Sequence, residues 1–248
     1  MRDDVLDAGR ITSETGWRAE VKETTGSTNA DVVLRAQEPE RLVVFAEEQT
    51  AGRGRLARTW ASPKGQGLWF SMLLRPTAPM WKWGLLPLIT GVALAEAVEE
   101  QTNLKTGLKW PNDLLIDDRK CAGILAEAAV PGAVIVGVGL NVWQDEQDLP
   151  TGPTAMQATS LTARGAQNLS RTSLAIAFLN RMTEHYETFE QTQQLTAYQQ
   201  RCWSIGREVR VTTPGGEVIA GTATGVDSEG RLIVGNRPIA AGDVTHVR

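Results

Sequence analysis

The sequence is poor in cysteine and histidine. Its two cysteines, Cys121 and Cys202, lie far apart and belong to no metal-binding or redox motif. A disulfide framework therefore does not hold this fold together, and a reducing compartment such as the cytoplasm fits. The two histidines, His185 and His246, stand in no catalytic motif, and we expect structural or surface positions for both.

Long apolar runs are also missing. The longest, LLPLITGVALA at 85–95, is far shorter than the roughly 20 residues that a membrane span needs. Residues 1–17 are acidic and lack the apolar stretch of a signal peptide. The formal net charge of −4 disfavours general attraction to nucleic acid or to an anionic membrane. We expect a soluble, cytoplasmic protein that binds neither, with any basic site confined to a small region.

Apolar periodicity predicts a domain in which strands and helices mix. The expected strands are 17–24, 41–49, 67–76, 104–110, 113–118, 121–130 and 132–143. The expected helices are 26–37, 86–101 and a long one at 171–200, with a polar loop at 144–170.

The composition changes near Ile205. Residues 206–248 contain short β-branched runs separated by PGG, DSEG and GN, which is typical of a small antiparallel β-barrel. We therefore expect two domains, 1–204 and 205–248.

A strongly basic loop stands out at 47–67, EEQTAGRGRLARTWASPKGQG. Its glycines allow the backbone to approach a ligand closely. Arg53, Arg55 and Arg58 supply planar guanidinium groups that suit phosphate or carboxylate oxygens. A solvated loop with incidental arginines is the simpler alternative, but the alternation of glycine and arginine favours an anion site that also serves as a lid.

The loop formally matches a dinucleotide fingerprint at Gly52, Gly54 and Ala57. That fingerprint requires a helix to open at the glycines, yet Pro63 and further glycines follow. It also requires an acidic residue about 20 positions on, and 72–80 contains none. A nicotinamide- or flavin-binding site is thereby disfavoured, and no P-loop motif occurs in the chain.

Three other polar stretches could join this loop. Ser27, Thr28 and Asn29 begin a helix and could either cap it or face a small polar ligand. The segment KWPND at 109–113 is either an ordinary proline turn or a means of presenting polar groups. Lys120 stands at the mouth of a hairpin just before a strand, and taken alone it would be an ordinary solvated lysine.

Together these stretches resemble the bacterial biotin–protein ligases, also called biotin–[acetyl-CoA-carboxylase] ligases. The family pattern is S-T-N, then Q-x-x-G-R-G-R-x-x-R-x-W, K-W-P-N-D and R-K-x-x-G-I-L. This chain has STN at 27–29, QTAGRGRLARTW at 49–60, KWPND at 109–113 and RKCAGIL at 119–125. GVGLNV at 137–142 and the closing GTATGVD and AGDVTHVR are also similar, so the resemblance covers about 17–248.

The resemblance implies a mixed α/β sheet flanked by helices, followed by a small SH3-like barrel. It implies that biotin and ATP form biotinyl-5′-AMP, with Mg²⁺, and that biotin then passes to a lysine. The acceptor would be the biotin carboxyl carrier domain of an acetyl-CoA or other acyl-CoA carboxylase. A monomer and a homodimer both fit, and the metal ligands are not assigned.

The resemblance also assigns roles to residues. The expected biotin-binding residues are Ser27, Thr28, Asn29, Gln49, Gly52, Arg53, Gly54, Arg55, Lys120 and Gly123. The expected ATP- or adenylate-binding residues are Arg53, Arg55, Arg58, Trp60, Lys109, Asn112, Lys120 and Asn141. Catalytic roles are expected for Arg55, Lys120 and Asp113, where Asp113 either binds Mg²⁺ or deprotonates the acceptor lysine. Trp69 is a candidate for the apolar slot.

Two departures from the family pattern bear on function. Leu56 and Ala57 replace the Arg-Gly of many relatives, which removes a charge and a mobile position. Only about 16 residues precede the first expected strand, too few for the DNA-binding domain of repressor relatives, so we expect an enzyme only. The alternatives are a lipoate–protein ligase and a non-catalytic biotin- or nucleotide-binding regulator.

Overall fold

The computed structural model describes residues 4–150 and 156–247, which form two β-sheets and five α-helices within these ranges. The larger sheet has seven strands in the order β1-β2-β3-β7-β6-β5-β4. Their bounds are β1 (Arg18–Thr25), β2 (Leu42–Gln49), β3 (Gly67–Leu74), β4 (Gly107–Lys109), β5 (Asp113–Ile116), β6 (Arg119–Val130) and β7 (Ala133–Asn141). Strands β1 and β2 pair in parallel and the other neighbours pair antiparallel, so the expected mixed sheet is confirmed.

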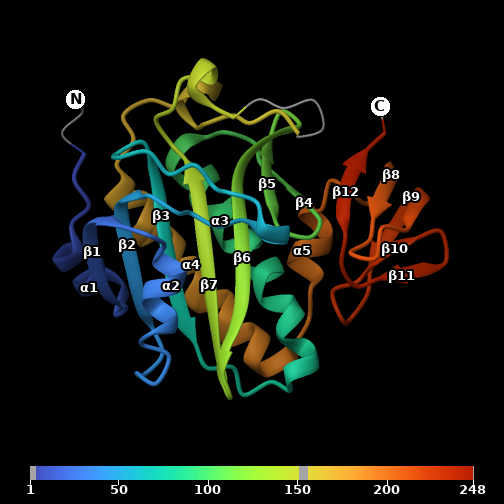
Figure 1. Ribbon diagram of the computed structural model, residues 1–248, viewed down its shortest axis with the longest axis horizontal. Coiled ribbons are helices and arrows are strands. Elements are labelled where there is room, and N and C mark those ends of the chain that lie inside the picture. Colours follow the sequence, from blue (N-terminus) through green and yellow to red (C-terminus); the bar gives the residue numbers. More distant parts are fainter. Residues whose placement is uncertain (1–3, 151–155, 248) are drawn as a thin grey trace.

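One face of this sheet is covered by two long helices, α3 (Leu86–Thr102) and α4 (Arg171–Thr192), as Figure 1 shows. Alternation along β3 explains the arrangement, because successive side chains point to opposite faces. Leu68, Phe70 and Met72 are buried in the core beneath the helices, where Phe70 packs against Phe178 of α4 at 5.0 Å. Trp69 and Ser71 therefore point to the other face.

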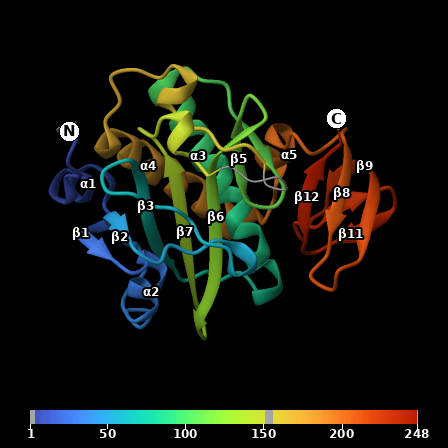
Figure 2. The ribbon, with the colours of Figure 1, turned by 45° about the horizontal axis from the view of Figure 1, so that its top comes forward.

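That other face carries the short helix α2 (Thr28–Val33) and the basic loop. Residues 50–66, drawn in cyan, connect β2 to β3 and cross in front of β7 and β6 in both ribbon views (Figures 1 and 2). The loop contains a tight turn, η1 (Arg55–Ala57), in which Leu56 and Ala57 have positive φ angles. The sheet thus has an apolar face that builds the core and a second face that is available for a site.

The smaller sheet follows α5 (Thr196–Arg201) and lies beside β4 and β5 (Figure 2). Its strands are β8 (Glu208–Thr212), β9 (Val218–Val226), β10 (Leu232–Val234), β11 (Arg237–Ile239) and β12 (Asp243–His246), all paired antiparallel as expected. Trp110 donates its indole N–H to the Gly230 carbonyl at 2.8 Å, and Lys82 donates to the Ser228 carbonyl at 2.7 Å. These bonds anchor the turn between β9 and β10 to the larger domain.

The prediction of a single helix at 171–200 is wrong. Helix α4 ends at Thr192 because Gln193 adopts a left-handed conformation, φ 53°, from which its N–H reaches the Phe189 carbonyl. Helix α5 begins only at Thr196, after this break. The sequence analysis also missed α1 (Ala8–Thr15), a short helix.

Two further elements are shorter than expected: α2 covers only Thr28–Val33 of the expected helix 26–37, and β4 only Gly107–Lys109 of the expected strand 104–110. The segment 144–170 contains two short 3-10 turns, η3 (Glu146–Asp148) and η4 (Thr162–Arg164), and is otherwise irregular where the structure describes it. A further 3-10 segment, η2 (Met80–Leu85), precedes α3. Among the helices of the described ranges, none combines the length and the apolar character needed to cross a bilayer.

Candidate active site

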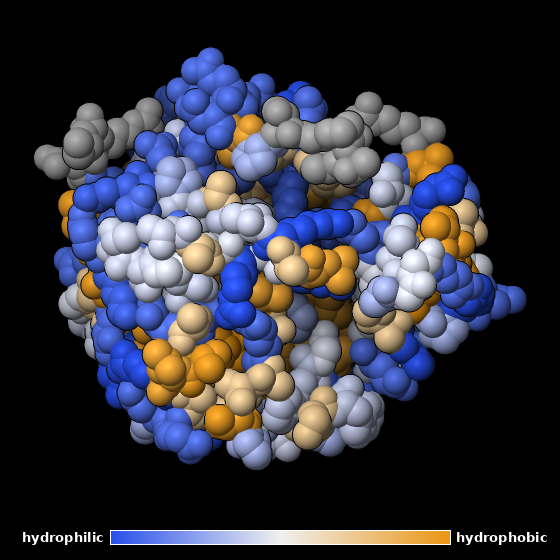
Figure 3. Space-filling view, in the orientation of Figure 1, coloured by the Kyte–Doolittle hydropathy of each residue, from blue (hydrophilic) through white to orange (hydrophobic). Residues whose placement is uncertain are grey.

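A cavity of about 950 Å³ lies between the exposed face of the large sheet, the basic loop and the small sheet. Figure 3 shows the surface hollowed in this region. The cavity is lined by nearly all the residues predicted from sequence: Ser27, Thr28, Asn29, Gln49, Arg53, Gly54, Arg55, Arg58, Trp60, Lys109, Asn112, Asp113, Lys120, Gly123 and Asn141. Segments far apart in the chain thus meet at one place.

Gly52 contributes in a different way, because it lies directly against the loop backbone. A Cβ atom at this position would approach the Trp60 carbonyl oxygen to 2.3 Å. The Trp60 N–H donates to the Gly52 carbonyl at 2.9 Å, so the two residues close the loop on itself. Gly52 therefore shapes the loop from within.

A polar wall forms where α2 meets β2 and β3. Thr28 donates its backbone N–H and its hydroxyl to Oε1 of Gln49, at 2.9 and 3.1 Å. The Thr28 hydroxyl also lies 2.7 Å from that of Ser71, which donates to Oδ1 of Asn29 at 2.5 Å. Ser27 occupies the N-cap position, but no capping bond from its side chain is described. This end of α2 therefore presents hydroxyls and amides in a connected array.

Glycines form the floor of the cavity. Gly123 of β6 and Gly139 of β7 are register partners, so their backbones lie side by side on the same face. A Cβ at Gly139 would lie 2.3 Å from Nε1 of Trp60, and one at Gly137 would lie 2.1 Å from Oδ1 of Asn29. The missing side chains leave the space that these two residues occupy.

Trp60 lies over this floor and closes the cavity from the loop side. Its ring is 3.0 Å from where a Cβ of Gly123 would be, and its centroid is 5.4 Å from Nζ of Lys120. Its Nε1 is buried and has no hydrogen-bond partner among the described residues. Trp69, expected in the apolar slot, is fully buried and meets Trp60 edge to face at 6.5 Å. Trp69 thus supports Trp60 from below.

Each of the three loop arginines contacts an acceptor on a different part of the fold. Arg53 donates to Oε2 of Glu127 on β6 at 2.9 Å. Arg55 donates to Oδ1 of Asn112 at 3.0 Å, and burial lowers the pKa of its guanidinium. Arg58 forms an ion pair with Asp243 of β12, which raises the pKa of Arg58 and lowers that of Asp243. The loop is therefore fixed by charge at three points.

Asp113 joins two lysines at the base of the cavity. Its Oδ1 lies 2.6 Å from Nζ of Lys120 and its Oδ2 lies 3.1 Å from Nζ of Lys109. Burial of this carboxyl opposes its ionisation, but the two ammonium groups outweigh burial and lower its pKa to about 2. Asp113 is thus ionised at neutral pH, with both oxygens directed at cations.

Two asparagines complete the predicted set. Asn112 follows the cis peptide bond between Trp110 and Pro111 and donates to the Ile124 carbonyl at 3.1 Å. Asn141, at the end of β7, donates to the Thr159 carbonyl at 2.9 Å. Asn112 thus ties its turn to β6, and Asn141 ties the end of β7 to Thr159.

Two family models match this chain. The biotin/lipoate A/B protein ligase family model matches residues 19–142, and the biotin protein ligase C terminal domain model matches residues 204–247. The chain belongs to the biotin/lipoate A/B protein ligase family.

Individual relatives agree with this family membership. A biotin–[acetyl-CoA-carboxylase] ligase of Mycobacterium tuberculosis is 39% identical over 100% of this chain and 94% of its own length. The bifunctional ligase/repressor BirA of Bacillus subtilis is 36% identical, over 79% of this chain and 62% of its own. The biotin protein ligase of Aquifex aeolicus, solved with biotin and ATP, is 27% identical with a TM-score of 0.80. It covers 93% of this chain and 98% of its own.

Sequence reasoning missed several residues of this ligase-family site. Ser71 and Glu127 lie in strands with no local motif, and only the strand register brings them to Asn29 and Arg53. The glycines of GVGLNV gave a signal, but it did not reveal that they make room for other side chains.

His246, expected to be structural or at the surface, also lines the cavity from β12. Its ring nitrogens lie 3.0 Å from the Ser204 hydroxyl and 3.3 Å from Arg207. Burial, then Lys109 and Arg207, lower the pKa of His246 to about 4. The imidazole is therefore neutral at physiological pH.

Acidic side chains do not gather into a metal cluster here. Across 4–150 and 156–247, no group of three or more His, Cys, Asp and Glu side chains could hold a metal ion. Asp113, the buried acid of this cavity, directs both oxygens at Lys109 and Lys120.

Proposed function

We propose that this protein is an ATP-dependent biotin ligase, which activates biotin as biotinyl-5′-AMP and transfers it to a lysine of an acceptor protein. The observation that carries the proposal is the arrangement of Arg53, Arg55 and Lys120 around one cavity that also holds a wall of hydroxyls and amides. The three cations suit a carboxylate beside a polyphosphate. The hydroxyls and amides suit a neutral, polar ring.

The first step joins two anions. A biotin carboxylate oxygen attacks the α-phosphorus of ATP, an O–P bond forms, and the bond to pyrophosphate breaks. Positive groups fixed in a water-poor site stabilise the charge that develops in such a reaction. We assign Arg53 and Arg55 to the carboxylate and α-phosphate, and Lys120 to the oxygen between the acyl carbon and phosphorus. Arg58 and Lys109 add positive charge nearby.

Biotin recognition requires partners for a ureido ring with two N–H donors and one carbonyl. We assign this ring to the wall of Ser27, Thr28, Asn29 and Gln49, with Gly123 supplying room on the floor. The interlinked bonds of this wall hold its oxygens in place before a ligand arrives, which reduces the cost of ordering them on binding.

We assign the nucleotide to the side of the cavity opposite this polar wall. Trp60 offers an aromatic face for a base, and Asn112 and Asn141 offer amides nearby. Trp60 lies between the floor of the cavity and solvent. It can therefore also shield biotinyl-5′-AMP, a mixed anhydride that water would hydrolyse. We assign these three residues, with the loop arginines, to ATP and the adenylate.

The second step consumes the adenylate. The acceptor lysine amine attacks the acyl carbon, a C–N bond forms, the C–O bond to AMP breaks, and a proton leaves the amine. With a pKa of about 2, Asp113 is too weak a base to remove that proton efficiently. We assign Asp113 to positioning Lys120 and Lys109. A Mg²⁺ ion bound chiefly by phosphate oxygens would neutralise charge on the nucleotide.

The carrier domain of an acetyl-CoA carboxylase is the acceptor that we propose, since the mycobacterial relative bears that name. The relatives favour biotin over lipoate as the acyl group. Both cysteines are free and buried, which agrees with work in a reducing cytoplasm. We place the domain division at residues 204 and 205, because the second sheet begins at Glu208.

Intact-mass analysis of a biotin-acceptor domain tests the proposal. The domain is incubated with this protein, ATP and Mg²⁺, with either biotin or lipoate. We expect a mass gain equal to one biotinyl group, dependent on ATP and absent with lipoate. A gain with lipoate alone would reassign the protein to lipoate ligation, and no gain with either acid would contradict ligase activity.

A further inference from the structure

A buried arginine lies behind the basic loop, outside the cavity. Arg171 is the first residue of α4, and its side chain is only 2% exposed. A positive charge at the positive end of a helix dipole is unfavourable, and burial adds a further cost. Such a residue requires strong partners, and the structure supplies them.

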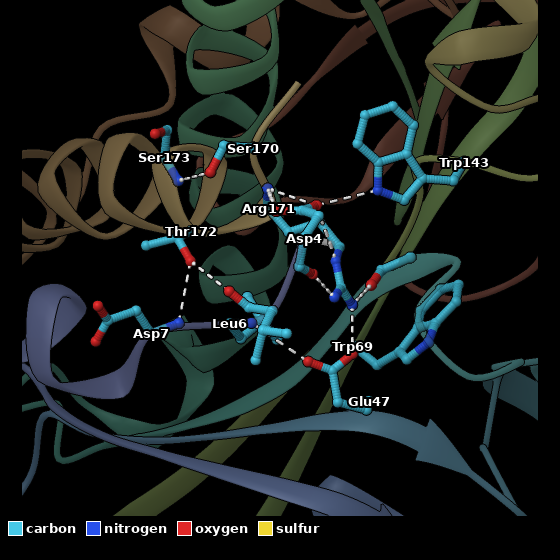
Figure 4. A network of polar contacts seen from close by, with 12 residues as sticks. Asp4, Leu6, Asp7, Glu47, Trp69, Trp143, Ser170, Arg171, Thr172 and Ser173 are labelled. Carbon is cyan, nitrogen blue, oxygen red and sulfur yellow. Dashed lines mark hydrogen bonds and ion pairs between the residues drawn. The ribbon is translucent and has the colours of Figure 1, made fainter. Parts of the chain in front are cut away.

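Those partners come from both ends of the loop (Figure 4). The Arg171 guanidinium donates to Oε2 of Glu47 at 2.7 Å, where β2 runs into the loop. The same nitrogen donates to the Gly67 carbonyl at 3.2 Å, where β3 leaves the loop. One side chain therefore spans the entry and the exit of residues 50–66.

The N-terminal segment supplies a second carboxylate. Asp4 accepts from Nε and from the backbone N–H of Arg171, at 3.2 and 3.1 Å, and Leu6 donates its N–H to Oε1 of Glu47 at 3.3 Å. Two carboxylates thus surround one guanidinium, and both oxygens of Glu47 are used. This arrangement leaves Glu47 little freedom to rotate.

The contacts of Arg171 with Glu47 and Gly67, together called the clamp, connect directly to the polar wall. The Glu47 carbonyl accepts from Gly65 at 3.0 Å, and Gln49, two residues further along β2, accepts from Thr28. A change in the position of Glu47 would therefore move the start of the loop and the Gln49 amide together.

We propose that Arg171 is a positioning residue for the ligase site, which sets the spacing between the two ends of the basic loop through Glu47 and Gly67. The inference rests on the proposed function for its kinetic consequence. The structural part of the inference, that Arg171 holds the two ends of the loop, can be tested without enzyme turnover.

The test uses Arg171→Lys, which keeps the charge but cannot reach both acceptors with one planar group. Arg75→Lys is the matched control, because Arg75 binds the Glu38 and Ala36 carbonyls at the opposite end of β3. We expect Arg171→Lys to raise the KM for biotin about tenfold, as a small displacement of binding groups would. We also expect trypsin to cleave the loop several times faster, while Arg75→Lys changes neither.

Active-site titration separates positioning from loss of folded protein. If Arg171→Lys lowers only the fraction of active enzyme, with KM and loop cleavage as in the wild type, the proposal is overturned. Glu47→Gln removes the charge of Glu47 and turns one of its two acceptor oxygens into a donor, so the bonds from Arg171 and Leu6 cannot both persist, and we expect it to reproduce both effects. The cleavage arm needs no ligase activity, so a wild type inactive toward biotin would defeat the proposed function and leave the clamp testable.

Discussion

Arg53 and Glu127 form an ion pair of 2.9 Å, and Asn29 donates to the same Glu127 oxygen at 2.6 Å. An internal carboxylate thus contacts the arginine that we assign to the substrate carboxylate. On this assignment, biotin competes with Glu127 for the Arg53 guanidinium.

Glu127→Gln removes this competitor while keeping the shape of the side chain. Because the pair is partly exposed, its contribution is small, and we expect the Kd for biotin to fall about twofold to fivefold. Isothermal titration calorimetry measures the change. Glu48→Gln is the control, since Glu48 bonds only Thr24 in the described contacts. Weaker binding by Glu127→Gln would show that Glu127 belongs to the binding wall.

Gly139→Ala tests the glycine floor. The new methyl group would lie 2.3 Å from Nε1 of Trp60 and must displace the indole from the sheet. We expect kcat/KM for ATP to fall tenfold or more, since even small misplacements in a site are costly. Gly225→Ala in β9 is the control, because nothing lies within 4 Å of its added Cβ. Unchanged kinetics in both variants would remove Trp60 from the nucleotide site.

Ala57→Gly tests the departure of this chain from the pattern of many relatives. Leu56 and Ala57 both have left-handed backbones, φ 55° and 57°, which cost a non-glycine residue about 1 kcal/mol. A glycine at 57 should favour this loop conformation and slow tryptic cleavage after Arg58 about fivefold. Ala61→Gly, at a position without positive φ, should instead speed cleavage. Equal cleavage of both variants would contradict this account of the loop.

His246 predicts a dependence of stability on pH. Its folded-state pKa of about 4 lies below the ordinary value of 6.5, so the unfolded chain binds the extra proton between these limits. Stability contributed by the neutral ring should therefore be complete above about pH 6.5 and fall as the pH drops toward 4. With allowance for partial solvent exposure, we expect the wild type to lose about 1 kcal/mol more than His246→Asn between pH 7 and 5. Urea unfolding at both pH values measures the free energy of unfolding of the two proteins. Equal losses in the wild type and in His246→Asn would show that a group other than His246 causes the pH dependence.

Local motifs indicated residues that line one cavity, because loop arginines, a proline turn and a helix start carry their chemistry in adjacent residues. Glu127 could not be found in this way, since its meeting with Arg53 depends on how β6 lies beneath the loop. Nothing in the sequence around Arg171 marks it as buried, and only the packing of α4 reveals its burial.

The secondary structure shows the same limit. Apolar runs of strand or helix length predicted the strands of the large sheet and α3, because elements buried on most sides need apolar residues along their length. The break after α4 left no such pattern, because Gln193 adopts its left-handed backbone in a polar stretch without glycine or proline. The helix ends with a hydrogen bond from the Gln193 backbone N–H to the Phe189 carbonyl, a contact that amino-acid composition does not predict.

The pairing of Trp60 with Trp69 gives the protein an internal optical reporter. Their rings are 6.5 Å apart and inclined at 71°, a geometry in which neighbouring indole transitions couple. Trp69 is fixed in the sheet, whereas Trp60 belongs to the loop that we expect to close over the substrates. A change in near-ultraviolet circular dichroism on adding biotin, lost in Trp60→Phe, would follow this movement in unlabelled protein.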